Sequence, residues 1–158
     1  MKVAFTGHRP NKIGGYDRNN QTRRLIRHAI GLKLRELHAT YVITGGALGV
    51  DTDAANVAWN LDIPYSVIAP CQNHSSKWPA ESQREYNVMC SHADEHRIID
   101  VPYSPAAMQR RNEIMVNECD VLIAIWDGSS GGTANCVRYA RSKKKTLIII
   151  NPNTLEVT

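Results

Sequence analysis

The segment 128–133, with the sequence GSSGGT, carries the strongest chemical signal in the chain. It follows the apolar run VLIAIW at 121–126 and precedes a helical pattern, so it lies where a helix begins. Backbone N–H groups in a first helical turn lack carbonyl partners, and the helix dipole adds positive potential there. Glycine also allows an anion to approach the main chain closely. These features predict a phosphate site. Its candidate residues are Asp127, Ser129, Ser130, Gly131, Gly132 and Thr133.

Two further motifs follow apolar runs, TGHRP at 6–10 and TGGALGVD at 44–51. Arg9 could pair with a phosphate, because a guanidinium binds oxyanions with two parallel hydrogen bonds. His8 could donate a hydrogen bond or act as a general acid, and both side chains are alternatively turn residues. Asp51 either reaches sugar hydroxyls or caps a helix. The candidates from these motifs are Gly7, His8, Arg9, Gly45, Gly46, Gly49 and Asp51.

The glycine spacing excludes two familiar nucleotide-binding motifs. Gly45 and Gly46 are adjacent, which does not match GxGxxG, and the chain has no GK[ST] P-loop. Neither an NAD-dependent dehydrogenase nor a P-loop NTPase is therefore predicted.

A third motif, RRNEIM at 110–115, lies on a predicted helix. Met108, Arg111 and Met115 share one helical face, so a core position for Met115 directs Arg111 toward the ligand and leaves Arg110 in solvent. A purely structural role for Arg111 is the alternative. Asn112 either braces a loop or contacts the ligand.

Apolar runs alternate with helical patterns along the whole chain. The predicted strands are 2–5, 40–44, 65–69, 96–100, 121–126 and 146–151, and the predicted helices are 21–37, 51–61, 81–90, 106–118 and 133–142. This alternation predicts one Rossmann-like, doubly wound α/β domain over 1–158, with a mostly parallel sheet and helices on both faces. In such sheets ligands bind at the carboxyl ends of the strands, where all the motifs fall.

Composition indicates a globular protein without a membrane span. The 158 residues are 42% hydrophobic and carry a net charge of +4. No apolar run approaches the roughly 20 residues that a membrane helix needs, and the first residues lack a signal-peptide pattern. We therefore expect a cytoplasmic protein that does not contact the membrane. The four cysteines lack CxxC spacing and the six histidines lack HExxH spacing, so neither a metal site nor a bound cofactor is expected.

Basic residues form an early and a late cluster. Such clusters are either a nucleic-acid footprint or solvated helix faces, with the late lysines complementing a helix dipole. The clusters lack the interleaved aromatic residues of single-strand binders, which favours the second interpretation. The cluster members are Arg18, Arg23, Arg24, Arg27, Arg138, Arg141, Lys143, Lys144 and Lys145.

Together the motifs resemble those of the SLOG superfamily. TGHRP and TGGALGVD are similar to the YpsA-like branch, whereas RRNEIM and GSSGGT resemble signatures shared with the LOG phosphoribohydrolases and the DprA-type DNA-processing proteins. The resemblance implies a phosphate on the glycine turn and a homodimer. Trp59, Trp78 or the helix that contains Tyr86 would supply the dimer interface, or would instead pack in the core.

The resemblance also implies a reaction, because LOG members cleave the N-glycosidic bond of nucleoside 5′-monophosphates. If the chain is such a hydrolase, Arg111 is catalytic. The glutamate expected three residues after Thr133 is replaced by Cys136. A neutral thiol does not stabilise an oxocarbenium-like state as a carboxylate does. The sequence therefore favours binding of a nucleotide-derived small molecule, such as a nucleoside phosphate or ADP-ribose. A phosphoribohydrolase is the alternative, and DprA-like DNA binding is the second alternative.

Overall fold

A computed structural model describes residues 1–99 and 102–158. Its six strands form one sheet in the order β4-β3-β2-β1-β5-β6, and all five strand pairs are parallel. The strands are β1 (Lys2–Gly7), β2 (Tyr41–Thr44), β3 (Tyr65–Ala69), β4 (Glu95–Ile98), β5 (Val121–Ile125) and β6 (Thr146–Ile150). The doubly wound α/β fold expected from the sequence is confirmed.

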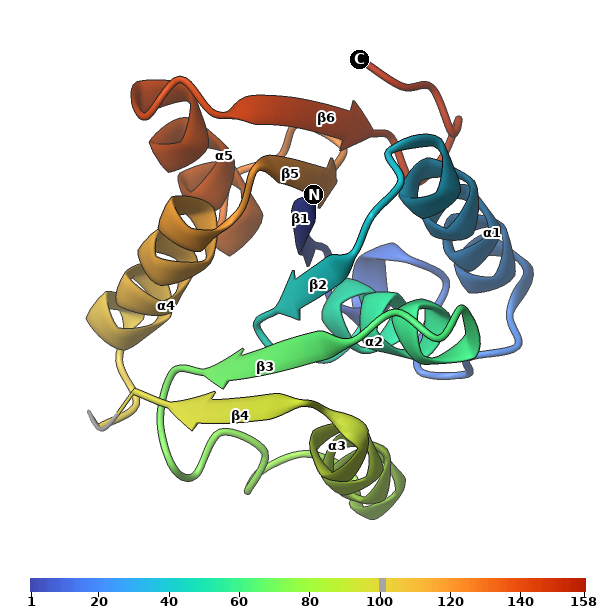
Figure 1. Ribbon diagram of the computed structural model, residues 1–158. Helices are drawn as coiled ribbons and strands as arrows, with labels where there is room; N and C mark the ends of the chain where they lie inside the picture. Colours follow the sequence, from blue (N-terminus) through green and yellow to red (C-terminus); the bar gives the residue numbers. More distant parts are fainter. Residues whose placement is uncertain (100–101) are drawn as a thin grey trace.

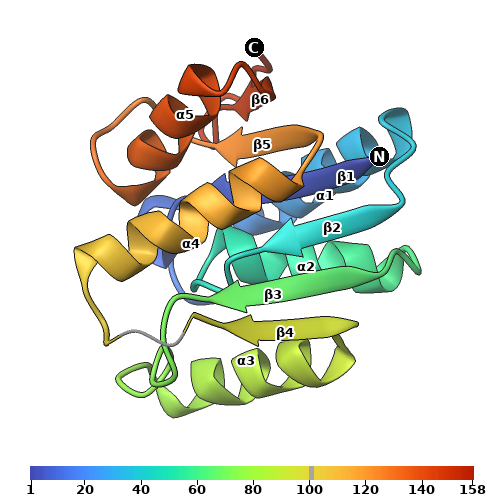
Figure 2. The same cartoon turned by 60° about the vertical axis from the view of Figure 1, so that its left-hand side comes forward.

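Five α-helices cover the two faces of the sheet (Figures 1 and 2). They are α1 (Gln21–Glu36), α2 (Val50–Asn60), α3 (Ala80–His92), α4 (Pro105–Glu118) and α5 (Gly132–Ser142). The first three pack on one face and the last two on the other, so two hydrophobic clusters sandwich the sheet. Because both faces are covered, β3 and β5 are buried at every position.

The strand order reverses beside β1. Strands β1 to β4 progress in one direction across the sheet, and the chain then returns to add β5 on the other side of β1. At such a switch point the helices that follow neighbouring strands leave on opposite faces, and a crevice opens at the carboxyl ends of the strands. The crevice is therefore expected between the ends of β1 and β5.

Most predicted boundaries differ from the observed ones by one or two residues. The predicted strand 96–100 corresponds to β4, which ends at Ile98. Position 100, the last position of the predicted strand, lies outside the described residues. The structure adds a short 3-10 helix, η1 (Pro10–Lys12), which no sequence pattern predicted. Proline occupies its first position, where the missing N–H costs nothing, and the following Ile13 is fully buried.

A buried ion pair joins α1 to α2. Arg23 donates from Nε and Nη2 to the two carboxylate oxygens of Asp53, each at 2.9 Å, and Arg27 adds a contact of 3.3 Å. The side chain of Asp53 is completely buried and that of Arg23 is 3% exposed. Arg23 also donates from Nη1 to the carbonyl of Tyr16 at 3.0 Å, which ties the segment before α1 to α2.

The early basic cluster therefore does not form one solvated surface. Arg23 is buried against Asp53, Arg27 shares the same carboxylate, and Arg18 lies 3.6 Å from Glu85. The late cluster is different, because Arg138, Arg141 and Lys143 are exposed around the end of α5.

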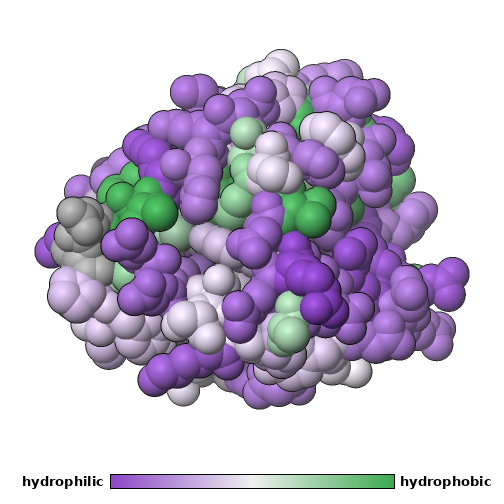
Figure 3. All heavy atoms as spheres, turned by 90° about the horizontal axis from the view of Figure 1, so that it is seen from below, coloured by the Kyte–Doolittle hydropathy of each residue, from purple (hydrophilic) through white to green (hydrophobic). Residues whose placement is uncertain are grey.

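The face on which α3 and β4 lie is mainly hydrophilic, with small separate hydrophobic areas (Figure 3). Of the residues predicted for a dimer interface or for the core, Tyr86 is buried and Trp78 packs against the core. Trp59 is 49% exposed and stacks on His92, with ring centroids 4.1 Å apart. No helix among the described residues is long and apolar enough to cross a membrane.

Replacing Asp53 should destabilise the fold strongly. In Asp53→Ala two guanidinium groups lose their shared carboxylate inside the protein, and breaking a buried pair costs about 3–5 kcal/mol. Urea unfolding should show a loss of this size. The matched control is Glu36→Ala, which removes the carboxylate of the exposed pair Lys33–Glu36 and should cost less than about 1 kcal/mol. Equal losses in the two variants would contradict the role assigned to Asp53.

Candidate functional site

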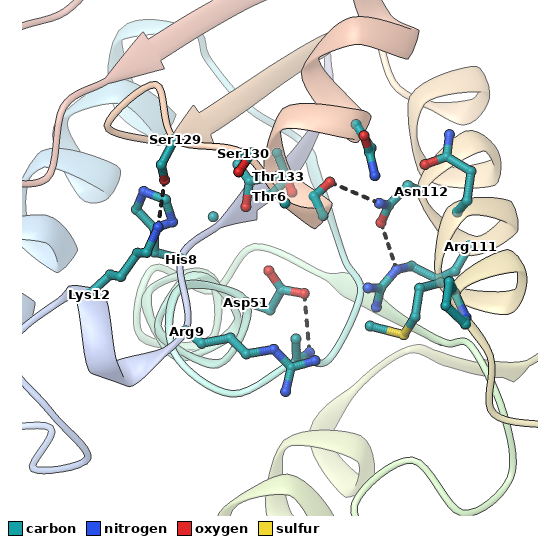
Figure 4. A pocket seen from close by; sticks show the side chains of 18 of the residues that line it. Thr6, His8, Arg9, Lys12, Asp51, Arg111, Asn112, Ser129, Ser130 and Thr133 are labelled. Atoms are coloured by element: carbon teal, nitrogen blue, oxygen red, sulfur yellow. Dashed lines mark hydrogen bonds between the residues drawn. The ribbon is translucent and has the colours of Figure 1, made fainter.

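A pocket of about 470 Å³ lies at the carboxyl ends of β1 and β5, where the switch point places it (Figure 4). Its walls come from the end of β1, from η1, from the start of α2, from α4 and from the turn before α5. This volume is within the range of small-molecule sites, roughly 300–1,000 Å³.

The pocket brings together most of the residues singled out from the sequence. Those that line it are Gly7, His8, Arg9, Asp51, Arg111, Asn112, Ser129, Ser130, Gly131, Gly132 and Thr133. The predicted residues outside the lining are Gly45, Gly46, Gly49 and Asp127. The lining residues that the site prediction did not include are Thr6, Asn11, Lys12, Ala47, Tyr103, Pro105, Met108, Gln109 and Asn135.

The glycine turn leaves the start of α5 open. Gly131 is the N-cap residue with φ of 139°, a conformation that favours glycine, and within the described chain no side chain caps this helix end. By contrast, the Asn20 side chain caps α1 and the Ser104 side chain caps α4. Since Gly131, Gly132 and Thr133 line the pocket, the free N–H groups of this first turn lie at its wall.

Lys12 approaches the same turn from η1. Its Nζ donates to Ser129 Oγ at 2.6 Å, and the Trp126 ring nitrogen donates to the Ser129 carbonyl at 2.8 Å. The Asp127 carboxylate accepts from the Ser129 N–H at 2.9 Å, and hydrogen bonds from Ser129 hold the pKa of Asp127 below its ordinary value. Asp127 thus shapes the turn from outside the pocket.

His8 connects the end of β1 to the end of β5. Its Nε2 lies 3.1 Å from the Asp127 backbone nitrogen and 2.9 Å from Asp127 Oδ1. Burial lowers the pKa of His8 more strongly than the Asp127 carboxylate raises it, which favours a neutral ring. In one tautomer Nε2 accepts from the Asp127 N–H, and in the other it donates to Asp127 Oδ1. His8 therefore fixes the turn as well as lining the pocket, so neither predicted role accounts for it alone.

Arg111 is 5% exposed and forms the inner wall on α4. Its Nη1 donates to the Gly45 carbonyl, and its Nε donates to Asn112 Oδ1 at 2.9 Å. Asn112 in turn donates to the Gly132 carbonyl at 3.4 Å. Burial lowers the pKa of Arg111, and the nearby Asp51 charge opposes that shift. The predicted orientations hold, since Arg111 points inward and Arg110 is exposed.

Asp51 lies across the pocket from Ser130 and Thr133 (Figure 4). It occupies the second position of α2, where Gly49 is the N-cap residue, and its Oδ2 accepts from the Ala47 N–H at 3.1 Å. Burial raises the pKa of Asp51, while the Arg111 charge opposes the shift. The side chain thus braces the loop before α2 and still borders the cavity.

A family model described as the YspA SLOG family matches residues 3–155. The chain belongs to this family. A related protein is the SPbeta prophage-derived protein YoqJ of Bacillus subtilis, 36% identical over 121 residues that cover 63% of this chain and 68% of YoqJ.

Solved structures that share the fold of this SLOG chain include a DNA-processing protein and a cofactor carrier. DNA processing protein A (DprA) from Streptococcus pneumoniae aligns with a TM-score of 0.68 at 17% identity, over 98% of this chain. The chain spans about half of that protein, 52%. The molybdenum cofactor carrier protein of Chlamydomonas reinhardtii aligns with a TM-score of 0.63 at 19% identity, over 94% of this chain and 74% of the carrier.

Cys136 stands where the resemblance to LOG members places a glutamate. Its side chain is completely buried in the cluster under α4 and α5. Burial raises the pKa of Cys136 to about 12, so the thiol stays neutral at physiological pH. It therefore supplies no negative charge to the pocket.

His74 lies in the loop between β3 and α3. It is 7% exposed, and neither ring nitrogen has a hydrogen-bond partner among the described residues. Its ring packs edge-on against Trp78 and Tyr86, with centroids 4.9 and 5.9 Å apart. Burial, together with the charges of Arg111 and Arg9, lowers the pKa of His74 to about 4.

A methyl group at position 45 should disturb Arg111. A Cβ built on Gly45 would overlap the guanidinium, so Gly45→Ala should lower the free energy of unfolding by about 1–3 kcal/mol. The matched control is Gly132→Ala, where a Cβ meets nothing within 4 Å and stability should be unchanged or higher. Chemical denaturation measures both, and a Gly45→Ala protein as stable as wild type would argue against this packing.

Acid should destabilise the fold through His74. The pKa of His74 is about 4 in the folded state against 6.5 for a free side chain, so the unfolded chain binds the proton first. Stability is complete above pH 6.5 and falls as the pH drops toward 4, by about 1.4 kcal/mol per pH unit. Between pH 7 and 4.5, wild type should therefore lose about 2–3 kcal/mol more than His74→Phe. His28→Gln, which changes an exposed histidine, should follow wild type.

Proposed function

We propose that this protein binds a phosphorylated, nucleotide-derived small molecule, with the phosphate on the turn 129–133. The observation that carries the proposal is the charge of the pocket wall. Arg9, Lys12 and Arg111 line the pocket, and among its described lining residues Asp51 is the one acid. Three cations against one carboxylate favour an anionic ligand.

The open start of α5 gives this positive pocket a specific place for phosphate oxygens. The N–H groups of its first turn have no capping side chain within the described chain, and the helix dipole is positive there. Ser129, Ser130 and Thr133 add hydroxyl groups at the same wall. Lys12 reaches this turn already, so a bound phosphate would receive its charge without a large rearrangement.

Asp51 supports a sugar phosphate over a bare anion. A buried carboxylate repels a second negative charge but accepts hydrogen bonds from hydroxyl groups. Because Asp51 lies across the pocket from the turn, a ribose between them would turn its hydroxyls toward Asp51 while its phosphate stays on the turn. This arrangement is the basis for a nucleotide-derived ligand.

Binding is favoured over N-glycosidic cleavage. The position of the expected glutamate holds the buried, neutral Cys136. Glu113 lies outside the pocket lining, and its carboxylate accepts a hydrogen bond from Gln109 at 3.2 Å. Nucleic acid is a less suitable ligand, because two arginines of the early basic cluster, Arg23 and Arg27, already pair with the carboxylate of Asp53. The likeness to DprA and to the molybdenum cofactor carrier concerns the fold alone, and this proposal takes no ligand from either protein.

Titration calorimetry at low salt tests the proposal with nucleoside monophosphates and ADP-ribose. Wild type should bind at least one of them, and chromatography should recover that ligand intact. Lys12→Ala should weaken binding about 10- to 100-fold, because hydrogen bonds to charged groups contribute roughly 1.5–3 kcal/mol.

The matched control is Lys143→Ala, which removes an exposed lysine at the other end of α5 and should leave the affinity unchanged. No heat signal from any of these ligands at millimolar concentration would refute the proposal. Release of free base would instead establish the phosphoribohydrolase alternative.

A further inference from the structure

Three side chains meet outside the pocket, where α3 lies beside the edge strand β4 (Figure 2). Tyr86 and Cys90 are four positions apart on α3, so they share one face of that helix. His96 lies on β4, and its Nε2 is 3.3 Å from Tyr86 Oη and 3.6 Å from Cys90 Sγ. The phenol and the thiol also interact with each other. An oxygen, a nitrogen and a sulfur atom are thus gathered in one place.

The distances within this group match those between ligands of one tetrahedral metal ion. Bonds from zinc of about 2.3 Å to sulfur and about 2.0–2.1 Å to nitrogen or oxygen place sulfur about 3.5–3.6 Å from nitrogen, and nitrogen about 3.3 Å from oxygen. The observed separations are 3.6 Å and 3.3 Å. The phenol contact is also longer than the commonest hydrogen bond between nitrogen and oxygen, about 2.9–3.0 Å. It therefore fits two ligands of one ion better than a donor and its acceptor.

Hydrogen bonding alone pairs this group incompletely. Nε2 of a neutral imidazole holds either one proton or one lone pair. It therefore forms a good hydrogen bond with the phenol of Tyr86 or with the thiol of Cys90, and not with both at once. A metal ion binds all three atoms together.

The three donor atoms suit a zinc-like ion that is reached from solvent. Thiolate and imidazole are ligands of Zn²⁺ in proteins, and three protein ligands leave the fourth position for water. Among the described residues no three side chains of His, Cys, Asp and Glu are arranged to hold a metal, so the phenol has to supply the third ligand. His96 is exposed and Cys90 is half-buried, which gives an ion a path to the group.

We propose that Tyr86, Cys90 and His96 form a binding site for Zn²⁺ or another divalent ion of tetrahedral geometry. Burial raises the pKa of Cys90 and of Tyr86, whereas a bound cation favours their charged forms, so metal binding releases both protons to solvent. The site goes beyond the proposed function, since none of its residues lines the pocket. The CxxC and HExxH spacings do not mark it, because its ligands come from a helix and from the strand that follows.

Titration of the tag-free protein with Co²⁺ tests the site, because Co²⁺ occupies tetrahedral zinc sites and absorbs visible light there. After treatment with EDTA, wild type should bind Co²⁺ with a sulfur-to-cobalt charge-transfer band that Zn²⁺ abolishes. Cys90→Ser should lose that band. His96→Gln and Tyr86→Phe should each weaken Co²⁺ binding at least tenfold, because even the outer partners of metal ligands contribute roughly 10- to 100-fold to affinity.

The matched controls are His92→Gln, which changes an exposed histidine at the end of α3, and Cys119→Ala, which removes a thiol on the other face of the sheet. Both should bind Co²⁺ like wild type, and far-UV circular dichroism should show that every variant is folded. Absence of the charge-transfer band in wild type at millimolar Co²⁺ would overturn the site. A band that persists in Cys90→Ser, or an unchanged affinity in His96→Gln or Tyr86→Phe, would overturn it equally.

Discussion

The arrangement of the pocket depends on one buried charge, the guanidinium of Arg111. A cation removed from water needs hydrogen-bond partners and a nearby negative charge, because otherwise its desolvation would be prohibitive. The Gly45 carbonyl, the Asn112 side chain and the charge of Asp51 meet that need. Since Gly45 precedes α2 and Arg111 lies on α4, this one group joins the two layers of helices at the carboxyl edge of the sheet.

Much of the architecture could be predicted from the sequence because it depends on local patterns. The uninterrupted apolar run at 121–125 indicated a strand covered on both faces, and β5 is buried at every position. The similar run at 146–150 is the edge strand β6, which is buried only at Ile150, so there the same indication was wrong. The alternation with helices indicated the parallel direction of both strands. The motif residues at strand ends therefore gathered at one edge. Boundaries differed where capping decided them, as for α2, which begins after Gly49.

The contacts between distant segments could not be predicted from local patterns. Lys12 meets Ser129 across 117 positions, and Arg23 meets Asp53 across 30. No periodicity marks either pair, because each depends on where two elements pack in space. The place of Tyr103 in the pocket lining could not be predicted for the same reason. In the sequence, an aromatic residue before a helix has the same pattern whether it lines a pocket or lies in an ordinary loop. Cys136 was singled out through the resemblance to LOG members, which places a glutamate three residues after Thr133.

The Arg23–Asp53 pair has a consequence for binding thermodynamics. The segment that carries Lys12 is held at Ile13 in the core and at the Tyr16 carbonyl, which accepts from Arg23. Asp53 anchors that arginine on α2, two positions after Asp51. The cationic and the acidic walls are thus preorganised by one helix, so a ligand would lose little affinity to ordering the chain around it. Loss of the Arg23–Asp53 pair would weaken binding by raising the conformational entropy that the chain loses when a ligand binds. It would do so without removing any group that contacts the ligand.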